Sequence, residues 1–440
     1  MKPNIIFFFA DQQRSDTFTE ETMPNLTKLA SEGVVFDNAF TCQPVCGPAR
    51  ACLQTGVYAS ENGSYINAIP LTNERKPLAK YMSEAGYETA YVGKWHLASG
   101  MGPGAPHYEK SAVPLELRGG YNGYWMASDV LEFTSDGYHG YVFDKDNNKV
   151  EFEGVRSDAI TDYALDFIDK QDGDKPFFLF LSHIEPHHQN STDDFECAKE
   201  DEHKFDGAAI PDDLKDIAGG NYRAKYPKYL SCINRLDYNL GRIVELLKHK
   251  GIYDSSIIIY TSDHGCHFKT RNVEYKRSCH EGSIHIPFVI TGGAFNGGRH
   301  EEKLVSLIDV PATILSLAGV GIPSDYRGKD IANLLGDKVN HNEVYIEISE
   351  SQTGRCIRTP RYTYSVKTRI FNFFRKSAKV YVEDYLYDNE KDHGQMHNLI
   401  KDPSYNGIKD ELRERLLTNI EAVEGFRPKI RRRILRKRNI

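Results

Sequence analysis

Short, unbroken apolar runs alternate with amphipathic stretches along most of the chain. Such a run is typical of a strand buried on both faces, whereas apolar residues at every third or fourth position predict a helix. The predicted strands cover residues 4–10, 33–36, 88–93, 176–181, 256–261 and 286–290, and the predicted helices cover residues 23–32, 78–85, 158–169 and 229–248. This alternation predicts an α/β fold, with a large mixed but mostly parallel sheet sandwiched by helices.

The pattern changes near residue 340. Short segments rich in β-branched and aromatic residues follow at 343–348, 354–357, 362–367 and 379–382, and an amphipathic stretch covers 408–420. Short strands of this kind favour a small antiparallel sheet. We therefore predict a large α/β domain at residues 1–340 and a smaller α+β subdomain at residues 341–440, with an antiparallel sheet and a terminal helix.

Composition narrows the class of protein. The chain has 440 residues, 40% of them hydrophobic, so it can bury a large core, and its formal charge of −7 argues against a nucleic-acid partner despite the basic stretch at 427–438. It contains no run of the ~20 apolar residues that span a membrane, so no membrane partner is expected. Residues 4–10 indicate a buried strand rather than a secretory signal, which predicts a cytoplasmic location. Eight thinly spread cysteines predict free thiols.

Polar side chains follow several predicted strands at the point where each strand ends. Asp11-Gln12 follows the first strand, and Lys94-Trp95-His96 follows the strand at 88–93. Residues 183–188 and Asp263-His264 occupy the same position after two later strands. Each group alone could be a turn or a surface loop. Because ligands of parallel α/β sheets gather at the carboxyl ends of the strands, together they predict one polar site.

Cys46-Gly47-Pro48-Ala49-Arg50 places a thiol, a proline and a fixed cation within about one turn of chain. Proline suits the first turn of a helix, so Cys46 is expected at or just before a helix N-terminus. The helix dipole and Arg50 favour negative charge there, which suits a thiolate, a hydrated aldehyde or a bound oxyanion. The alternatives are a buried cysteine in a turn, or a redox or metal cluster with Cys42 and Cys52, whose spacing matches no zinc pattern.

This pentapeptide fits Cys-x-Pro-x-Arg, and the chain resembles the type I sulfatases of the alkaline phosphatase superfamily. The resemblance implies that a formylglycine-generating or anaerobic sulfatase-maturating enzyme converts Cys46 to formylglycine. It also implies a divalent cation, Ca²⁺ by preference, held by Asp11, Gln12, Cys46, Asp263 and His264. Many members have an aspartate and an asparagine where this chain has Gln12 and His264. The nitrogen donor admits Mn²⁺ or Zn²⁺, and Mg²⁺ is a further possibility.

The resemblance assigns the remaining catalytic roles. Lys94 and Lys276 would hold the sulfate group, and Arg50 would hold the hydrated formylglycine that attacks sulfur. His187 would protonate the departing alcohol, with His183 and His188 close enough in sequence to be alternatives. His96 would take a proton from the covalent sulfate ester and release sulfate.

The resemblance favours a sulfuric ester hydrolase acting on a sulfated carbohydrate, such as a glycosaminoglycan- or mucin-type fragment. Five polar residues near the expected sulfate pocket are candidates for binding the sugar: His188, Gln189, Arg271, Asn272 and His280. Two other functions stay open. One is a phosphonate monoester or phosphodiester hydrolase of the same superfamily, and the other is a noncatalytic glycan-binding relative in which Cys46 stays a thiol.

Overall fold

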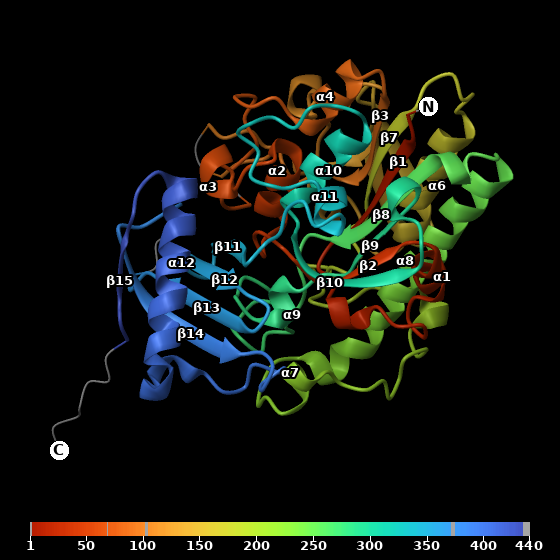
Figure 1. Ribbon diagram of the computed structural model, residues 1–440. Helices are drawn as coiled ribbons and strands as arrows, with labels where there is room; N and C mark the ends of the chain where they lie inside the picture. Colours follow the sequence, from red (N-terminus) through yellow and green to blue (C-terminus); the bar gives the residue numbers. More distant parts are fainter. Residues whose placement is uncertain (1, 68, 102–103, 371–374, 434–440) are drawn as a thin grey trace.

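A computed structural model describes residues 2–67, 69–101, 104–370 and 375–433. A ten-stranded sheet forms its centre, in the order β10-β2-β9-β8-β1-β7-β3-β4-β5-β6 (Figure 1). Its strands are β1 (Asn4–Ala10), β2 (Val34–Phe40), β3 (Glu88–Lys94), β4 (Tyr124–Ser128), β5 (His139–Asp144), β6 (Lys149–Glu153), β7 (Phe177–Ser182), β8 (Ser256–Ser262), β9 (Phe288–Thr291) and β10 (Arg299–Ser306). The five central strands β8, β1, β7, β3 and β4 are parallel, whereas β9, β5 and β6 run antiparallel to their neighbours. The predicted mixed, mostly parallel sheet is confirmed.

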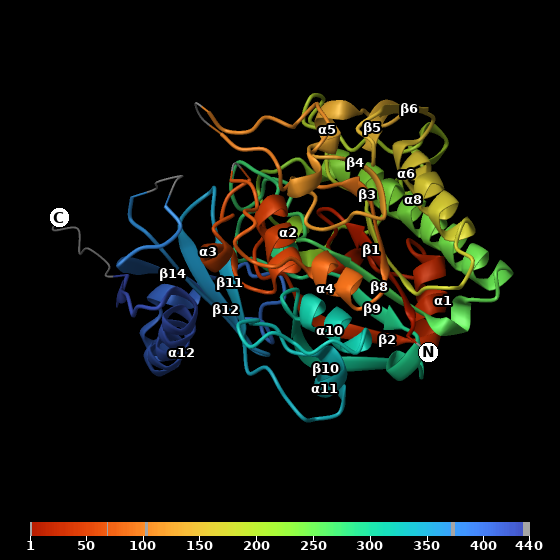
Figure 2. The same ribbon diagram turned by 90° about the horizontal axis from the view of Figure 1, so that it is seen from above.

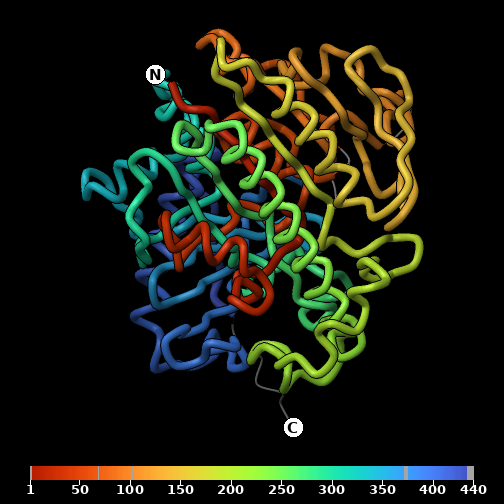
Figure 3. The backbone as a smooth tube through the Cα atoms, turned by 90° about the vertical axis from the view of Figure 1, so that its right-hand side faces the viewer, coloured from red at the N-terminus to blue at the C-terminus, as the bar shows by residue number. Residues whose placement is uncertain are grey.

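Helices cover both faces of this sheet (Figure 2). The helices of the α/β part are α1 (Pro24–Glu32), α2 (Cys46–Thr55), α3 (Ala59–Asn62), α4 (Leu78–Glu84), α5 (Leu131–Thr134), α6 (Arg156–Asp169), α7 (Asp212–Lys215), α8 (Tyr222–His249), α9 (Glu281–Ile284), α10 (Asp309–Leu317) and α11 (Ile331–Leu335). On one face α6 and α8 lie side by side, as the yellow and green helices of Figure 3 show, and an ion pair between Arg235 and Asp158 joins them. On the other face α2, α4 and α10 pack together.

The central position of β1, with helices on both faces of the sheet, explains why its residues form an unbroken apolar run. Ile5, Phe7 and Phe9 enter the core beneath α2 and α4. The alternate residues Ile6, Phe8 and Ala10 enter the core beneath α6 and α8. Because successive side chains of a strand point to opposite faces, a strand covered on both sides needs an apolar residue at every position. Residues 4–10 thus form a central strand as predicted, and the cytoplasmic location inferred from the same stretch stays a prediction.

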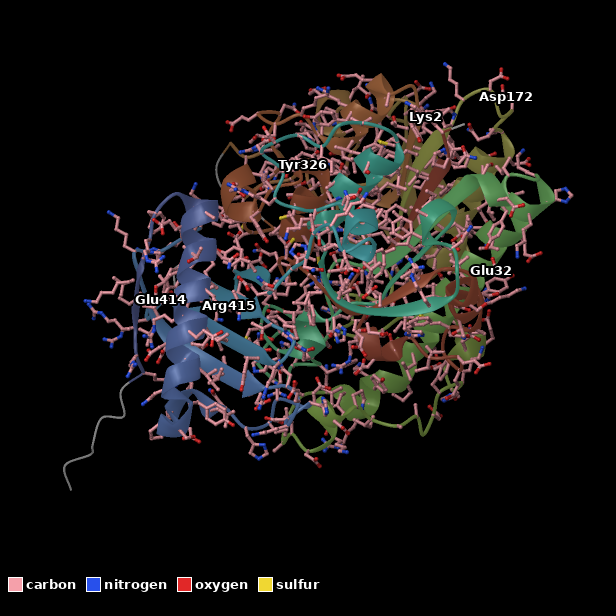
Figure 4. All side chains as sticks on the ribbon, in the orientation of Figure 1. Lys2, Glu32, Asp172, Tyr326, Glu414 and Arg415 are labelled. Atoms are coloured by element: carbon pink, nitrogen blue, oxygen red, sulfur yellow. The ribbon has the colours of Figure 1, made fainter. Side chains whose placement is uncertain are left out.

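The C-terminal part forms a second, five-stranded sheet with one long helix against it (Figure 1). Its elements are β11 (Val344–Ile348), β12 (Gly354–Arg358), β13 (Tyr362–Lys367), β14 (Val380–Asp388), β15 (Lys429–Arg431) and α12 (Asn406–Glu424). The strands β11 to β14 pair antiparallel, as predicted, and β15 adds a parallel edge. Glu414 and Arg415 are neighbours on α12 (Figure 4) and have different partners: Arg415 forms an ion pair with Glu343, and Glu414 forms one with Arg427.

Several elements were missed or predicted too short, because their sequences lack the continuous apolar run of a buried strand or the expected start of a helix. Strands β5, β6 and β10 lie toward the two edges of the large sheet and carry exposed polar residues, so no continuous apolar run marks them. Helix α8 begins at Tyr222, seven residues before the predicted start at 229, and continues through Pro227. Its first turns are held by the buried Tyr222 and Tyr226.

Main-chain hydrogen bonds bring the carboxyl ends of three central strands to one place. The amide of His183 donates to Phe9 O at 2.9 Å, that of Asp11 to Glu185 O at 3.1 Å, and that of Asp263 to Ala10 O at 3.3 Å. The residues that follow β1, β7 and β8 therefore meet. Within the described residues, no helix is both long and apolar enough to cross a membrane.

Candidate active site

Cys46 is the first residue of α2, and its side chain faces the ends of the central strands. Its Sγ atom lies 2.8 Å from Lys276 Nζ, 3.2 Å from His264 Nε2 and 3.4 Å from Asp11 Oδ1. Burial and Asp11 raise the pKa of this thiol, but Lys276, Lys94 and His264 outweigh them and lower it to about 7. The pocket therefore favours an anion at the position of the sulfur atom.

Four potential metal ligands surround the same point. One ligand atom from each of Asp11, Cys46, Asp263 and His264 lies within 4.8 Å of the others, and all four residues are buried. His264 Nδ1 lies 2.9 Å from Gly265 O and donates its proton there, so Nε2 faces Cys46 and offers a lone pair whenever the ring is neutral. This tautomer suits a metal ligand.

Gln12 adds a fifth candidate ligand. Its backbone φ of 74° is unusual for a residue other than glycine, and its amide donates to Asp263 Oδ1 at 2.9 Å. The side-chain Oε1 is buried and has no hydrogen-bond partner among the described residues. A buried acceptor without a partner is costly, and a cation removes that cost.

The two carboxylates of this cluster also fit a cation. Burial and the neighbouring Asp11 raise the pKa of Asp263 to about 7, which reflects the repulsion between two close carboxyl groups. Asp263 Oδ2 makes no hydrogen bond to any described residue. Oxygen ligands from Asp11, Asp263 and Gln12, with one nitrogen from His264, therefore fit a divalent cation.

Lys94, the last residue of β3, lies between two carboxylates. Its Nζ is 2.9 Å from Asp11 Oδ2 and 3.3 Å from Glu132 Oε2, and its side chain is fully buried. Burial lowers the pKa of this lysine, but Asp11 and Glu132 outweigh burial and raise it well above its ordinary value. Lys94 is thus a permanent cation. Glu132, on the short helix α5, was not predicted, since no sequence pattern marks it.

Arg50 binds the ends of the central strands. Its Nη1 donates to Lys94 O at 3.0 Å and to Ser182 Oγ at 2.6 Å, and its Nη2 donates to Asp11 Oδ2 at 3.1 Å. The planar guanidinium group orients Asp11 and ties α2 to β3 and β7. The expectation that Arg50 also holds the modified Cys46 stays a prediction.

Two further candidate residues, His96 and His187, lie near the charged groups of this cluster. His96 follows Lys94 with a φ of 60°, and its main chain lies close to Gly47 beside the nucleophile. Burial and Lys94 lower the pKa of His96 to about 4. His187 Nδ1 lies 2.5 Å from His188 O, which leaves Nε2 for a substrate atom. Burial and Lys276 hold the pKa of His187 well below its ordinary value.

His183, the alternative to His187, lies on the other face of the sheet. Its ring packs against Phe8 at 4.9 Å between centroids, and its Nε2 contacts Thr161 Oγ1 of α6 at 3.3 Å. This placement removes His183 from the site. The other alternative, His188, stacks on His187 at 4.4 Å and on Tyr275 at 4.0 Å, so it stays a candidate for binding substrate.

Four predicted sugar-binding residues have other partners. Gln189 bonds Arg156 and the carbonyls of Glu132 and Ser135. Arg271 donates to the carbonyls of Gly394 and Gln395, and Asn272 donates to that of Lys276. His280 Nε2 lies 3.1 Å from Tyr387 Oη in the C-terminal sheet. Through these contacts the four side chains hold loops and the two sheets together, and their role in binding a sugar stays a prediction.

A family model described as Sulfatase matches residues 3–320, and one described as N-sulphoglucosamine sulphohydrolase, C-terminal, matches residues 272–422. The chain is similar to an uncharacterised sulfatase, YidJ, of Escherichia coli K12, at 27% identity over 96% of this chain and 88% of the relative. It is also similar to an N-acetylglucosamine-6-O-sulfatase of Bacteroides thetaiotaomicron, at 25% identity over 94% and 86%.

Solved structures share the fold. A 4S-sulfatase from glycosaminoglycan metabolism in Bacteroides thetaiotaomicron superposes with a TM-score of 0.81, at 23% identity and covering 96% of this chain and 97% of the other. A phosphonate monoester hydrolase from Silicibacter pomeroyi superposes with a TM-score of 0.70, at 19% identity and 96% coverage of each chain. The Sulfatase model covers well over half of this chain, including Cys46, Lys94, Asp263 and Lys276. The chain therefore belongs to the sulfatase family.

Proposed function

We propose that this protein hydrolyses the sulfate ester of a sulfated carbohydrate, using formylglycine made from Cys46 and a divalent cation. One observation carries the proposal: the buried Cys46 lies at a helix N-terminus, 2.8 Å from Lys276 and within the ligand cluster of Asp11, Asp263 and His264. Positive charge converges on a point where a side-chain anion or a bound oxyanion is stabilised.

The geometry suggests a role for each residue. Lys276 faces the nucleophile position and can bind a sulfate oxygen, while Lys94 holds Asp11 in place. His187 can act as the general acid only when its ring is protonated at Nε2; because burial and Lys276 hold its pKa low, the protonated ring is a strong acid that gives this proton readily to a departing alkoxide. Burial and Lys94 likewise hold the pKa of His96 low, so its neutral ring can accept a proton.

The absent groups would supply what these side chains lack. Formylglycine supplies a hydrated aldehyde as the oxygen nucleophile, and the cation supplies positive charge next to the sulfate oxygens. Asp11, Gln12, Asp263 and His264, with the modified Cys46, would hold the cation, Ca²⁺ first and Mn²⁺, Mg²⁺ or Zn²⁺ as alternatives. A formylglycine-generating or anaerobic sulfatase-maturating enzyme is the partner that this chemistry requires.

The substrate class rests on relatives. The N-acetylglucosamine-6-O-sulfatase of Bacteroides thetaiotaomicron supports a sulfated sugar. The fold shared with a phosphonate monoester hydrolase, together with a histidine in the ligand cluster, supports that activity as the second candidate.

The test uses protein produced together with a formylglycine-generating enzyme. Mass spectrometry of the Cys46 peptide should show a loss of about 18 Da, as replacement of a thiol by an aldehyde requires. Turnover of an aryl sulfate, an aryl methylphosphonate and sulfated mono- and disaccharides is then compared, with Cys46→Ala as the inactive control. Faster turnover of the phosphonate would favour the second candidate. An unmodified Cys46 with no turnover of any ester would favour the glycan-binding alternative and end the proposal.

A further inference from the structure

The turn between β11 and β12 reaches from the C-terminal sheet to the catalytic centre. Ser349 Oγ accepts a hydrogen bond from Gln43 Nε2 at 2.7 Å. Gln43 precedes Cys46 by three residues in the sequence. Ser351 Oγ donates to Arg277 O at 2.5 Å. Glu350 lies between these two serines, so the turn contacts the chain on both sides of the nucleophile.

Glu350 places one carboxylate at the centre of these contacts. Its Oε1 accepts the main-chain amide of Asn67 at 2.6 Å, and its Oε2 lies 2.6 Å from Arg277 Nη2 and 3.4 Å from Asn67 Nδ2. The side chain is only 4% exposed. Its φ of 65° is in the left-handed region, which a glutamate adopts only when its contacts hold it there.

Asn67 transmits this contact to the nucleophile. Its Oδ1 accepts the amide of Gly47 at 2.9 Å, and Gly47 is the residue directly after Cys46. A Cβ atom at Gly47 would come within 3.0 Å of that oxygen, so the close approach depends on glycine. One carboxylate of the C-terminal part thus fixes the first turn of α2.

Arg277 transmits the same contact to the catalytic lysine. It follows Lys276 directly, and its own φ of 72° shows a strained loop that needs support. Lys276 Nζ lies 2.8 Å from Cys46 Sγ. Glu350 therefore links the nucleophile and the lysine that faces it, although it lies outside the 3–320 match to the Sulfatase family model.

We propose that Glu350 is a positioning residue of the active site, supplied by the C-terminal subdomain. Through Asn67 and Arg277 it sets the distance between the nucleophile at position 46 and Lys276. This inference rests on the proposed function, because it concerns the same reaction. A shift of about 1 Å between reacting groups can lower a rate about a hundredfold, so such a brace affects kcat rather than folding alone.

The test compares Glu350→Gln with a matched control, Glu347→Gln. Glu347 lies on β11, is 2% exposed, and accepts bonds from Ser60 N and Oγ of α3 at 2.9 and 2.5 Å. Both substitutions remove a buried charge from the contact between the two sheets, but only the first touches Asn67 and Arg277. Thermal unfolding and the extent of Cys46 modification are measured for each variant, and rates are expressed per modified enzyme.

Glu350→Gln should lower kcat by about ten- to a hundredfold with KM changed less than about threefold. Glu350→Asp, which keeps the charge, should recover part of the loss. Glu347→Gln should retain kcat even when it melts at a lower temperature. Equal losses of kcat in Glu347→Gln and Glu350→Gln would overturn the proposal, because they would show a general effect of stability. If Glu350→Gln does not fold, Glu350→Asp decides, and a kcat equal to wild type overturns the proposal.

Hydrogen exchange gives a second measurement that needs no turnover. In unmodified protein, Glu350→Gln should increase exchange at the amides of Gly47 and Asn67, and Glu347→Gln should do so only near Ser60. If wild-type enzyme hydrolyses no ester, the proposed function fails while this measurement still decides the positioning. Unchanged exchange at Gly47 in Glu350→Gln would then overturn it.

Discussion

His183 should make the stability of this protein depend on pH in a way that one substitution can isolate. The ring is completely buried between Phe8 and α6, and its Nδ1 has no hydrogen-bond partner among the described residues. Burial lowers its pKa from 6.5 to about 4. Replacing it by leucine puts an apolar side chain of similar size in its place and removes the titrating group. Thr161 Oγ1 keeps its bond to Ser157 O.

The size of the effect follows from the two pKa values. Between pH 6.5 and 4 the unfolded chain binds a proton at His183 and the folded chain does not, so stability is lost as the pH falls through this window. From pH 7.5 to pH 5.0 the loss amounts to about 2 kcal/mol for this one residue. The variant His183→Leu lacks this loss. Its free energy of unfolding, relative to wild type, should therefore rise by about 2 kcal/mol over the same change in pH.

The assay is urea-induced unfolding of wild type and His183→Leu at pH 7.5 and 5.0, with the difference compared between the two pH values. The contribution of the other buried histidines is the same in both proteins, so it cancels in that comparison. A pH-independent difference for His183→Leu would refute the reasoning, because it would mean that the folded protein accepts the proton. His183→Leu should also retain kcat, since its ring faces away from Cys46.

Three further predictions concern the site. Lys276→Met should raise the pH at which unmodified, chelator-treated Cys46 is half alkylated above about 7, because Lys276 lowers the thiol pKa most; an unchanged midpoint, read by mass spectrometry, would contradict this. Arg50→Lys should lower the free energy of unfolding, measured in urea, by about 2–4 kcal/mol, because lysine cannot keep all three hydrogen bonds of Arg50. The control Ser182→Ala should cost ~1 kcal/mol. A loss in Arg50→Lys no larger than that of the control would contradict this prediction. His187→Ala should lower kcat about a hundredfold for a sugar sulfate and far less for a nitrophenyl sulfate, whose leaving group needs no proton; equal losses would exclude His187 as the acid.

The central strands could be predicted from sequence because burial on both faces leaves an unbroken apolar run. Strand β1 was predicted without error in its bounds, and β7 and β8 to within one residue. Edge strands such as β6 have one solvated face and polar residues at most positions, so this signal is absent. A proline in the sequence does not by itself show where a helix begins. Helix α8 begins before Pro227 and continues through it, because tyrosines on its buried face hold its first turns.

The residues of the site likewise fall into those that the sequence predicts and those that it does not. Asp11 and Asp263 follow parallel strands and Lys94 ends another, so the topology alone brings them to one edge of the sheet. Side-chain direction within a loop is not encoded so simply, and His183 and His187 diverge although only three residues separate them. Glu132 and Glu350 have no local signal, because each acts through a contact with a residue distant in sequence.

The charges of the site show where specificity has to arise. Three buried cations and three buried carboxylates are close to balance before a metal ion enters: Arg50, Lys94 and Lys276 against Asp11, Asp263 and Glu132. A divalent cation therefore leaves an excess of positive charge that attracts an anionic ester. A sulfate monoester and a phosphonate monoester each carry a single negative charge, so this excess cannot separate them. Under the proposed function, discrimination must come from groups that touch the alcohol or the phosphorus substituent, and His187 with the adjacent His188 is the candidate for this contact.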